Sequence, residues 1–490
     1  MAATFLCFDL GTTKTKSSLI NENGTTIYMS ENLVKTYSHE YKYQNPDDYF
    51  NIVHDEIKRI KKQHPKKFKD AACLICTGQM AGILGIDQNW DVIFPWTFSV
   101  DTNYIDYLYK LEAEAGEDIR KLCGGVPTGT AKILWIKNEK PMDYKKIDKF
   151  INLTTYVAGK LCGLGAKEAF IDFSCLTMNG LADIREGAWN STLAEKLEID
   201  MSKLPVIKRP FECIGRINKY IFDTNRDIEV LAGCGDQIAG FIGAGVINKN
   251  DIIDVAGTYS VLGYCTDRFL DDSKKKVLST IYSGISDIYY QVSVINATGH
   301  TYDWFRKRFD YTPDDKADSL GLFFVPHIGG RYNPPQPYFD GAWVGLNWDH
   351  CLDHFFVSIL ESIGYEFGYA LDYIKILNKL KKDVFSTIKV IGGGAKNNLW
   401  NEIKSSILNI KYIKMTQIPY EIRGGFLISR CKNDIRKYKK YLAYNKELVE
   451  GMVYPDSKKV DSYSKSKEDY IFIIDKMAEI FQRLKLQKKA

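Results

Sequence analysis

The sequence predicts an α/β fold made of two similar domains that face each other across a shared cleft. Apolar stretches with the length of strands alternate with amphipathic helical stretches along the chain, which is typical of α/β architecture. The stretch DLGTT, which begins at Asp9, returns as DVAGTYS, which begins at Asp254. In both copies an apolar strand enters a Gly-Thr turn and a second apolar strand leaves it. A repeat spaced by half of a 490-residue chain indicates two related domains, which we expect at 1–247 and 248–490.

Composition excludes several classes of protein. The 66 Lys and Arg residues against 61 Asp and Glu give a net charge of +5, which is too weak to indicate a nucleic-acid partner. The basic run at 56–69 is expected to be the solvated face of an amphipathic helix that ends at Pro65. No run of 18 uncharged apolar residues and no signal-peptide pattern is present, so we expect neither a membrane nor a secreted protein. The 11 cysteines are scattered singly, which suits a reducing, cytoplasmic location.

Two close pairs of candidate metal ligands do not predict a metal site. Cys73 and Cys76 lie three apart in a stretch that is typical of a buried strand, so their side chains point to opposite faces. His350 and His354 have the i, i+4 spacing of helical zinc ligands, but no third ligand motif lies nearby. We expect these histidines to be solvated or to cap a helix.

The elements before residue 90 follow from turn and cap residues. Residues 5–29 are expected to form strands with a hairpin turn at Asn23-Gly24. A helix is expected to begin at Pro46, because a proline and two aspartates occupy its first turn. Residues 71–87 form a further strand region, and alternating helices and strands continue through residue 245 without a Ser/Gly-rich linker.

The stretch DLGTTKTK is interpreted as a phosphate-binding hairpin. Gly11 allows close backbone approach to a ligand, and the amides and hydroxyls of Thr12 and Thr13 offer donors to phosphate oxygens. Lys14 and Lys16 add positive charge, and Asp9 suits water-mediated binding of the Mg²⁺ that accompanies a nucleotide. The alternative is an ordinary polar hairpin. The chain has no GxxxxGK[ST] motif, so this is not a P-loop, and no GxGxxG follows the first strand.

Two further glycine-rich stretches are candidate site elements. In VIGGGAKNNLW (390–400) a strand, a glycine turn and a helix beginning near Asn397-Asn398 would bring helix amides to a ligand, although a simple packing turn is the alternative. In LAGCGDQIAGFIGAGVI (231–247) a close-packed helix of small residues begins at Asp236. Asp236 is either a helix cap or a general base that deprotonates an attacking hydroxyl.

These motifs, in this order and spacing, resemble the FGGY carbohydrate kinases, which are ATP-dependent sugar kinases with an actin-like, ribonuclease H-like fold. DLGTTKTK resembles the first phosphate motif of that family, and GCGDQIAGFIGAG resembles the segment that carries its catalytic aspartate. GTYS at 257–260 and GGGAKNNLW resemble its nucleotide motifs, and residues 321–350 resemble its C-terminal signature. The stretch beginning YPDSKKVDSYSK resembles its closing helix, so the resemblance covers essentially the whole chain.

The resemblance implies ATP and Mg²⁺ as cofactors and a role for each matched residue. Asp236 would act as the catalytic base, and Asp9 would organise the metal. The sugar site would take Gln79, Met80, Asp101, Asp236 and Gln237. The ATP site would take Thr12, Thr13, Lys14, Lys16, Gly257, Thr258, Gly299, Asp303, Gly394, Ala395 and Asn398. A small sugar and ATP would be the binding partners, and a homodimer is compatible with this family.

The GQM sequence at 78–80 favours a pentulose kinase, with D-xylulose first. Xylulokinases of the family read GQMHG, whereas this chain has Ala81 in place of the histidine, and Asn103 stands where the family has arginine. The alternatives are therefore a kinase of ribulose, of a hexulose or of a polyol such as glycerol or erythritol. A non-enzymatic, nucleotide-gated binding protein is a further alternative, because the fold also serves scaffolds.

Overall fold

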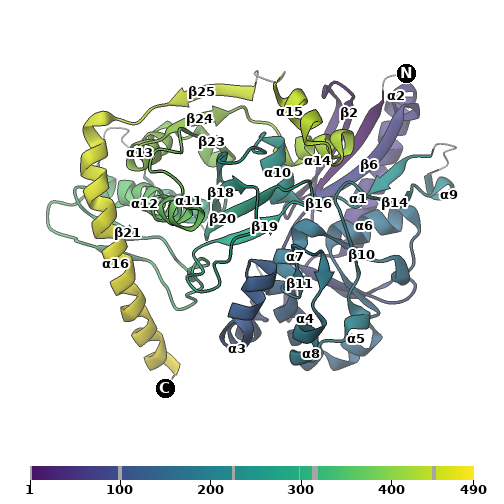
Figure 1. The fold of residues 1–490 in the computed structure, drawn as a ribbon, viewed down its shortest axis with the longest axis horizontal. Helices are drawn as coiled ribbons and strands as arrows, with labels where there is room; N and C mark the ends of the chain where they lie inside the picture. The colour runs from purple at the N-terminus through teal and green to yellow at the C-terminus, as the bar shows by residue number, and fades with distance from the viewer. Residues whose placement is uncertain are drawn as a thin grey trace.

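Two lobes, each built on a seven-stranded sheet, form the molecule (Figure 1). The structure is a computed structural model, and it describes residues 3–97, 102–222, 227–296, 298–311, 318–443 and 448–489. The first half of the chain forms the lobe drawn in purple to teal, and most of the second half forms the lobe drawn in green to yellow.

The elements of the first half, in chain order, are β1 (Thr4–Leu10), β2 (Lys14–Asn21), β3 (Thr26–Leu33), β4 (Tyr37–Ser38), β5 (Lys42–Tyr43), α1 (Pro46–Gln63), α2 (Pro65–Lys69), β6 (Ala71–Gly78), β7 (Ile83–Ile86), β8 (Val92–Thr97), α3 (Ile105–Cys123), α4 (Thr128–Glu139), α5 (Pro141–Lys146), β9 (Lys149–Ile151), α6 (Leu153–Cys162), η1 (Ala166–Glu168), β10 (Phe170–Asp172), α7 (Phe173–Asn179), β11 (Ala182–Asp183), β12 (Ala188–Trp189), α8 (Ser191–Lys196), η2 (Met201–Lys203), β13 (Val206–Lys208), β14 (Cys213–Arg216), α9 (Lys219–Phe222), β15 (Glu229–Leu231), β16 (Cys234–Gly235) and α10 (Asp236–Gly243). Those of the second half are β17 (Ile252–Ala256), β18 (Ser260–Thr266), β19 (Ser279–Tyr282), β20 (Tyr289–Ile295), α11 (Thr298–Arg308), β21 (Phe323–Val325), β22 (Ala342–Val344), α12 (Leu352–Asn378), β23 (Thr387–Ile391), η3 (Gly393–Lys396), α13 (Asn398–Leu408), β24 (Lys411–Met415), α14 (Tyr420–Cys431), α15 (Ile435–Ala443), β25 (Val449–Val453) and α16 (Ser457–Lys489).

The two large sheets have the same topology. The first has the order β14-β15-β6-β1-β2-β3, and the second runs β19-β20-β18-β17-β23-β24-β25. β1 pairs antiparallel with β2 and parallel with β6, and β17 pairs antiparallel with β18 and parallel with β23. The next neighbours outward also correspond, since β2–β3 and β18–β20 are antiparallel and β6–β15 and β23–β24 are parallel. The internal repeat predicted from the Gly-Thr turns is thus a repeat of a whole sheet.

The first sheet begins with two consecutive hairpins, and the sequence predicts both of their turns. β2 and β3 turn at residues 22–25, with Gly24 at a φ of 84°, as the Asn23-Gly24 pair predicts. A second antiparallel turn joins β1 to β2 at residues 11–13, and this turn carries the DLGTT motif.

The helix predicted at Pro46 is α1, and its first turn explains the prediction. The Asn45 side chain accepts a hydrogen bond from the amide of Asp47, and Pro46 occupies the first turn. Lys61 and Lys62 lie in the last turn, and α1 ends before Pro65. The helix packs with α6 on one face of the first sheet, which leaves the other face of that sheet to the interior of the molecule.

Two short helices pack against each other between the sheets. α10 comes from the first half of the chain, and α14, from the second half, packs on β1 and β6 of the first sheet. Gly424 of α14 lies so close to the Ala239 carbonyl of α10 that a Cβ atom there would overlap it. A helix from the second half of the chain therefore packs on the sheet of the first lobe, so the two lobes do not separate strictly in chain order. We propose the domain boundary between residues 247 and 248, just before the second copy of the sequence repeat.

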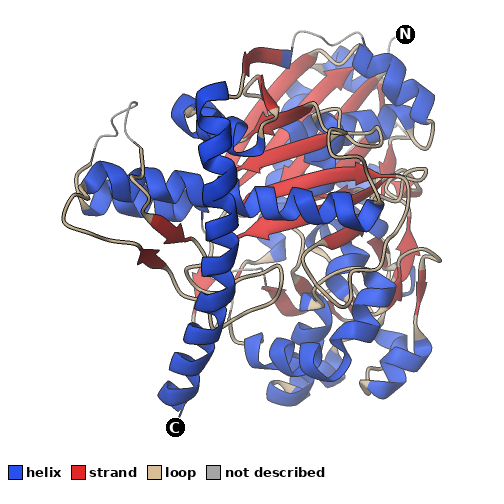
Figure 2. Cartoon of the chain, turned by 60° about the vertical axis from the view of Figure 1, so that its left-hand side comes forward, coloured by secondary structure: helices blue, strands red, loops and turns tan. Residues whose placement is uncertain are grey.

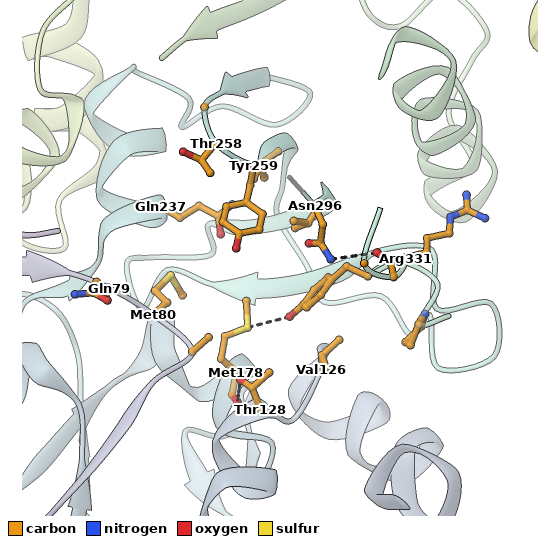
Figure 3. A pocket seen from close by; sticks show the side chains of 18 of the residues that line it. Gln79, Met80, Val126, Thr128, Met178, Gln237, Thr258, Tyr259, Asn296 and Arg331 are labelled. Carbon is orange, nitrogen blue, oxygen red and sulfur yellow. Dashed lines mark hydrogen bonds between the residues drawn. The ribbon is translucent and has the colours of Figure 1, made fainter. Parts of the chain in front are cut away.

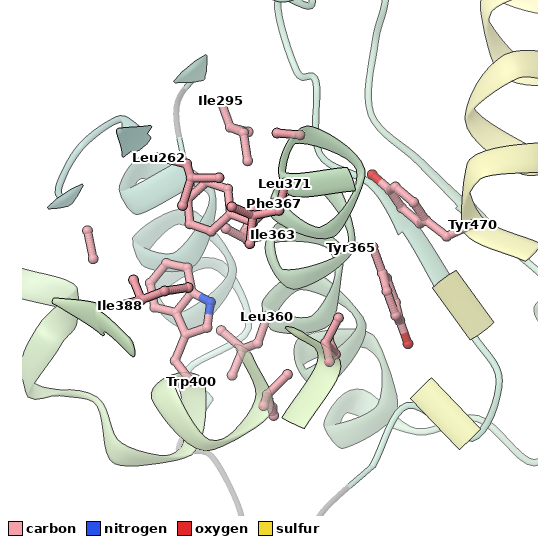
Figure 4. Packing of buried hydrophobic residues seen from close by; sticks show 14 of the residues in the cluster. Leu262, Ile295, Leu360, Ile363, Tyr365, Phe367, Leu371, Ile388, Trp400 and Tyr470 are labelled. Atoms are coloured by element: carbon pink, nitrogen blue, oxygen red, sulfur yellow. The ribbon is translucent and has the colours of Figure 1, made fainter. Parts of the chain in front are cut away.

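The core of the second lobe surrounds α12. In Figure 4, Leu360, Ile363 and Phe367 of this helix face the side chains contributed by the sheet and α13, while Tyr365 lies on the side of Tyr470 from α16. α16 extends from this lobe as a long projecting helix (Figure 2). Among the described residues, no helix is both long and apolar enough to cross a membrane.

Candidate active site

The first lobe carries an inserted region that forms one wall of a large cavity. Residues after β6 form a small sheet of order β8-β7-β9 and helices α3, α4 and α7, which lie below the two main sheets in Figure 1. The cavity has a volume of about 830 Å³. Met80, Val126 and Met178 line it from the first half of the chain, and Tyr259 and Asn296 line it from the second half (Figure 3).

A second cavity, also of about 830 Å³, lies within the second lobe. Its walls are the β17–β18 turn, the first turns of α11 and α13, and the glycines that follow β23. The amide of Gly299 donates to the carbonyl of Thr258 at 3.1 Å, which holds α11 against the Gly-Thr turn. The N-terminal amides of two helices and a glycine-rich turn suit a phosphate-bearing ligand. Gly257 and Thr258 line both cavities, so the two spaces meet at this turn.

Asp236 is the first residue of α10 and lines the first cavity, where two other carboxylates are close enough to affect it. Burial, together with the negative charges of Asp9 and Glu421, raises the pKa of Asp236 to about 8. Burial and Glu421 raise the pKa of Asp9 to about 6, against the opposing effect of Lys16. A carboxyl group with a pKa near neutrality can accept a proton from a hydroxyl and can later release it.

Lys16 is the cation of this cluster. Its Nζ lies 3.2 Å from Oδ2 of Asp9 and 3.2 Å from Oε2 of Glu421, which comes from α14. Burial lowers the pKa of Lys16, but the charges of Asp9 and Glu421 outweigh that effect and raise it. Thr77, at the end of β6, donates to Oδ1 of Asp9 at 3.3 Å. The first phosphate motif is thus tied both to the first sheet and to α14.

Most of the predicted site residues line one of the two cavities. The first cavity is lined by Thr12, Gln79, Met80, Asp236, Gln237, Gly257 and Thr258, and the second by Gly257, Thr258, Gly299, Asp303, Gly394 and Asn398. Ala395 lies buried beneath the second cavity, where its carbonyl accepts from Asn401 at 2.9 Å. Lys14 is exposed, with its Nζ 2.6 Å from Glu31. Asp101 lies outside the described residues.

The side chain of Gln79 is bound by the protein itself. Its Nε2 donates to Oε1 of Gln44 at 2.9 Å and to the hydroxyl of Tyr49 at 2.7 Å, and its Oε1 accepts from Nε1 of Trp96 at 3.2 Å. Both donor hydrogens of the amide are therefore used. Gln79 also lines the first cavity, and its contact with a sugar stays a prediction.

Several residues of the site were not predicted from the sequence. They are Glu421, Tyr259, Asn296, Thr128 and Met178 in the first cavity, and His300, Tyr302, Arg306, Lys396 and Trp400 in the second. Glu421 follows a proline and precedes Gly424-Gly425 in the sequence PYEIRGG. That combination indicates a helix start that packs closely, and it is the signal that could have drawn attention to this residue.

The histidine and cysteine pairs take the structural positions that the sequence predicts, a helix cap and a buried strand. Nδ1 of His354 accepts from the amide of Cys351 at 3.0 Å and caps α12, and Cys73 and Cys76 are buried in β6. Within the described ranges, no group of three or more His, Cys, Asp or Glu side chains is arranged to hold a metal ion. Two partly or fully buried carboxylates beside Asp236 nevertheless fit a hard cation that keeps most of its ligands as water and phosphate oxygens.

The chain matches the model of the FGGY family of carbohydrate kinases, N-terminal domain, over residues 4–243, and that of the C-terminal domain over residues 254–419. It is 24% identical over 442 residues to the xylulose kinase of Bacillus subtilis, with 86% of each chain covered. It is 23% identical over 444 residues to the gluconokinase of the same organism, with 84% of each covered. The solved xylulose kinase of Rhodospirillum rubrum has a TM-score of 0.85 at 18% identity, covering 98% of this chain and all of that one. This likeness confirms the predicted actin-like fold.

Proposed function

The chain belongs to the FGGY family of carbohydrate kinases and is an ATP-dependent sugar kinase, and from this premise we propose that it phosphorylates the terminal hydroxyl of a neutral ketose, with D-xylulose as the first candidate. The single observation that carries the proposal is the meeting of the two cavities at Gly257 and Thr258, with Asp236 on the wall of the first. A nucleotide in the second cavity would present its terminal phosphate at this junction, where a sugar in the first cavity can reach it.

In this proposal each element of the site has one task. The amides at the starts of α11 and α13 bind the phosphates of ATP, and Lys16 and Thr12 meet the terminal phosphate from the other lobe. Asp236 accepts the proton of the sugar hydroxyl as that oxygen attacks the γ-phosphorus in line. Gln237, the next residue of α10, lines the same wall and is positioned to bind a sugar hydroxyl. Closure of the two lobes over both substrates keeps out water that would otherwise hydrolyse ATP.

We also propose Mg²⁺ as the metal that accompanies ATP. Asp9 and Glu421 would hold it through water, and the ion would neutralise charge on the phosphates. The metal would also reduce the mutual repulsion of the three carboxylates around Lys16.

The walls of the first cavity favour a neutral sugar over a sugar acid. Arg331 is the one cationic side chain among its described lining residues. Its Nη2 lies 3.0 Å from Oε2 of the buried Glu366, and in Figure 3 its guanidinium points away from the other labelled side chains. The carboxylate of an aldonate such as gluconate would therefore find no free positive partner on these walls, and burying an unpaired charge is unfavourable.

The position of Ala81 leaves the choice among neutral substrates open. Ala81 has a φ of 62°, and its carbonyl accepts from Nζ of the buried Lys132 at 3.0 Å, so the loop after Met80 is held in place without the histidine of the xylulokinases. The side chain of Ala81 fills less of the cavity than a histidine would. We therefore expect weaker selectivity among pentuloses than a histidine-bearing relative shows, and ribulose, a hexulose and a polyol remain the other candidates.

The test is a substrate panel with the purified protein, ATP and Mg²⁺. ADP release is measured for D-xylulose, D- and L-ribulose, a hexulose, gluconate, glycerol and erythritol, and kcat/KM is compared. We expect a pentulose, with D-xylulose first, to have the highest value. If a hexulose, a polyol or gluconate exceeds every pentulose by about tenfold, equivalent to about 1.4 kcal/mol, the substrate assignment is wrong although the kinase activity stands.

A further inference from the structure

Asp172 is a buried carboxyl group that the proposed transfer does not use. It lies at the end of β10 and is 1% exposed. Its Oδ1 accepts from the amide of Ser174 at 2.9 Å, while its Oδ2 has no hydrogen-bond partner among the described residues. Burial raises the pKa of Asp172. Burying a carboxyl group costs free energy unless it is hydrogen-bonded. The hydrogen bonds of Oδ1 are therefore the contacts that offset this cost.

The hydroxyl of Ser174 links Asp172 to the turn before Asp236. It donates its single hydrogen to Oδ1 of Asp172, and it accepts from the amide of Gly235 at 2.8 Å. Because the hydrogen is committed to the carboxyl group, the lone pairs of the hydroxyl face Gly235. The hydrogen bond to Asp172 thus fixes the orientation of the Ser174 O–H bond.

Gly235 is held tightly at this contact. It pairs with Gly78 at the end of β6 and is the residue from which α10 begins. A Cβ atom at position 235 would overlap the side chain of Met80, so the turn before α10 fits closely against Met80, which lines the first cavity. A shift of the Gly235 amide would move Asp236, the next residue. Ser174 lies in the first turn of α7, and at the other end of α7 Met178 lines the first cavity.

We infer that Asp172, acting through Ser174, is a positioning residue for Asp236. The inference rests on the proposed role of Asp236 as the base. Neither side chain lines the cavity, so each acts through the Gly235 amide rather than on a substrate.

The test compares Ser174→Ala with two conservative variants. Ser174→Ala should lower kcat by about 10- to 100-fold, because a misplaced catalytic group reduces the rate steeply, while the KM values for sugar and ATP change little. Ser174→Thr and Asp172→Asn keep the hydroxyl and the acceptor oxygen and should retain most of the wild-type kcat, whereas Asp172→Ala should not. Ser405→Ala is the matched control, since its buried hydroxyl donates to the Ile410 carbonyl at 2.8 Å in α13, away from Asp236.

A double-mutant cycle separates this inference from the proposed function. If Ser174 acts through Asp236, Ser174→Ala should have no further effect on kcat in an Asp236→Asn background. If Ser174→Ala lowers the melting temperature but keeps kcat at the level of Ser405→Ala, the residue is only structural and the inference is wrong. If Asp236→Asn itself turns over normally, the assignment of the base fails instead.

Discussion

Three carboxylates and one lysine lie together where the first phosphate motif meets α10 and α14. Asp9 and Glu421 share Lys16, and their charges act on Asp236. At the scale of single residues, this arrangement keeps Asp236 less acidic than an exposed aspartate. The protonation of one side chain therefore depends on a residue more than 180 positions away in the chain.

Replacing Glu421 with glutamine should make Asp236 more acidic. Glu421 is one of the two charges that raise the pKa of Asp236, so its removal should lower that pKa. The acid limb of the pH profile of kcat/KM for the sugar should then move to lower pH. Glu31→Gln is the control, because Glu31 pairs with the exposed Lys14. An acid limb that stays in place, or that moves to higher pH, would contradict the proposed coupling.

The raised pKa of Asp236 also predicts how stability depends on pH. The pKa is about 8 in the folded protein and near the ordinary aspartate value of 3.8 in the unfolded chain, so the protonated form contributes stability below about pH 4 that is lost as the pH rises through about 8. Asparagine stays neutral throughout. The melting temperature of Asp236→Asn, without nucleotide, should therefore exceed that of the wild type by an amount that grows from pH 4 to pH 8. A difference that is constant with pH would show that burial does not raise this pKa.

The sequence predicted the positions of some site residues, but it did not predict the hydrogen-bond partners of others. Asp236 and Gly257 were predicted because small residues and turns surround them, and both line a cavity. Gln79 belongs to a recognisable motif, but its amide is used by Gln44, Tyr49 and Trp96, two of which are far from it in sequence. Such partners are set by tertiary packing and leave no local pattern.

At the scale of elements, the second cavity, which we propose as the nucleotide cavity, depends on close backbone contact between the β17–β18 turn and α11. A Cβ atom on Gly299 would lie 2.7 Å from the Gly257 carbonyl oxygen and 3.1 Å from Cα of Thr258. Gly299→Ala should push this turn away from the phosphates and raise the KM for ATP by about tenfold or more, since lost contacts to a charged group are worth about 1.5–3 kcal/mol.

Gly393→Ala is the matched control for Gly299→Ala. Gly393 also lines the nucleotide cavity, but a Cβ atom there would meet nothing within 4 Å. Equal effects of the two substitutions on the KM for ATP would show that the Gly299 contact does not shape the site. A fall in kcat without a change in KM would place its effect elsewhere.

Elements with strong end signals were predictable, and those without them were not. The helix beginning at Pro46 and the helix beginning at Asp236 are where the sequence predicts them. The β1–β2 turn is also where the Gly-Thr motif predicts it. The packing of α14 on the first sheet could not be predicted, because it joins segments about 400 residues apart.

At the scale of the whole molecule, two sheets with one topology meet around α10 and α14. The repeat of the Gly-Thr turn indicated this duplication, and the matching strand order confirms it. The first sheet contributes Asp9 and Lys16, whereas the other two carboxylates come from α10 and α14. The second cavity lies in the second lobe. The sequence alone could not give the width of the sugar cavity, since its walls come from α3, α7 and the loop around Arg331.

The most direct test of this account is the Asp236→Asn variant, assayed for both turnover and ATP binding. We expect kcat with the best sugar of the panel to fall by about 10²-fold or more, as for the loss of a general base, while the Kd for ATP measured by calorimetry stays close to that of the wild type. This result would place Asp236 in the transfer step and not in nucleotide binding. Near-normal turnover in the variant would contradict the account and would leave Asp236 as the first residue of α10 without a catalytic role.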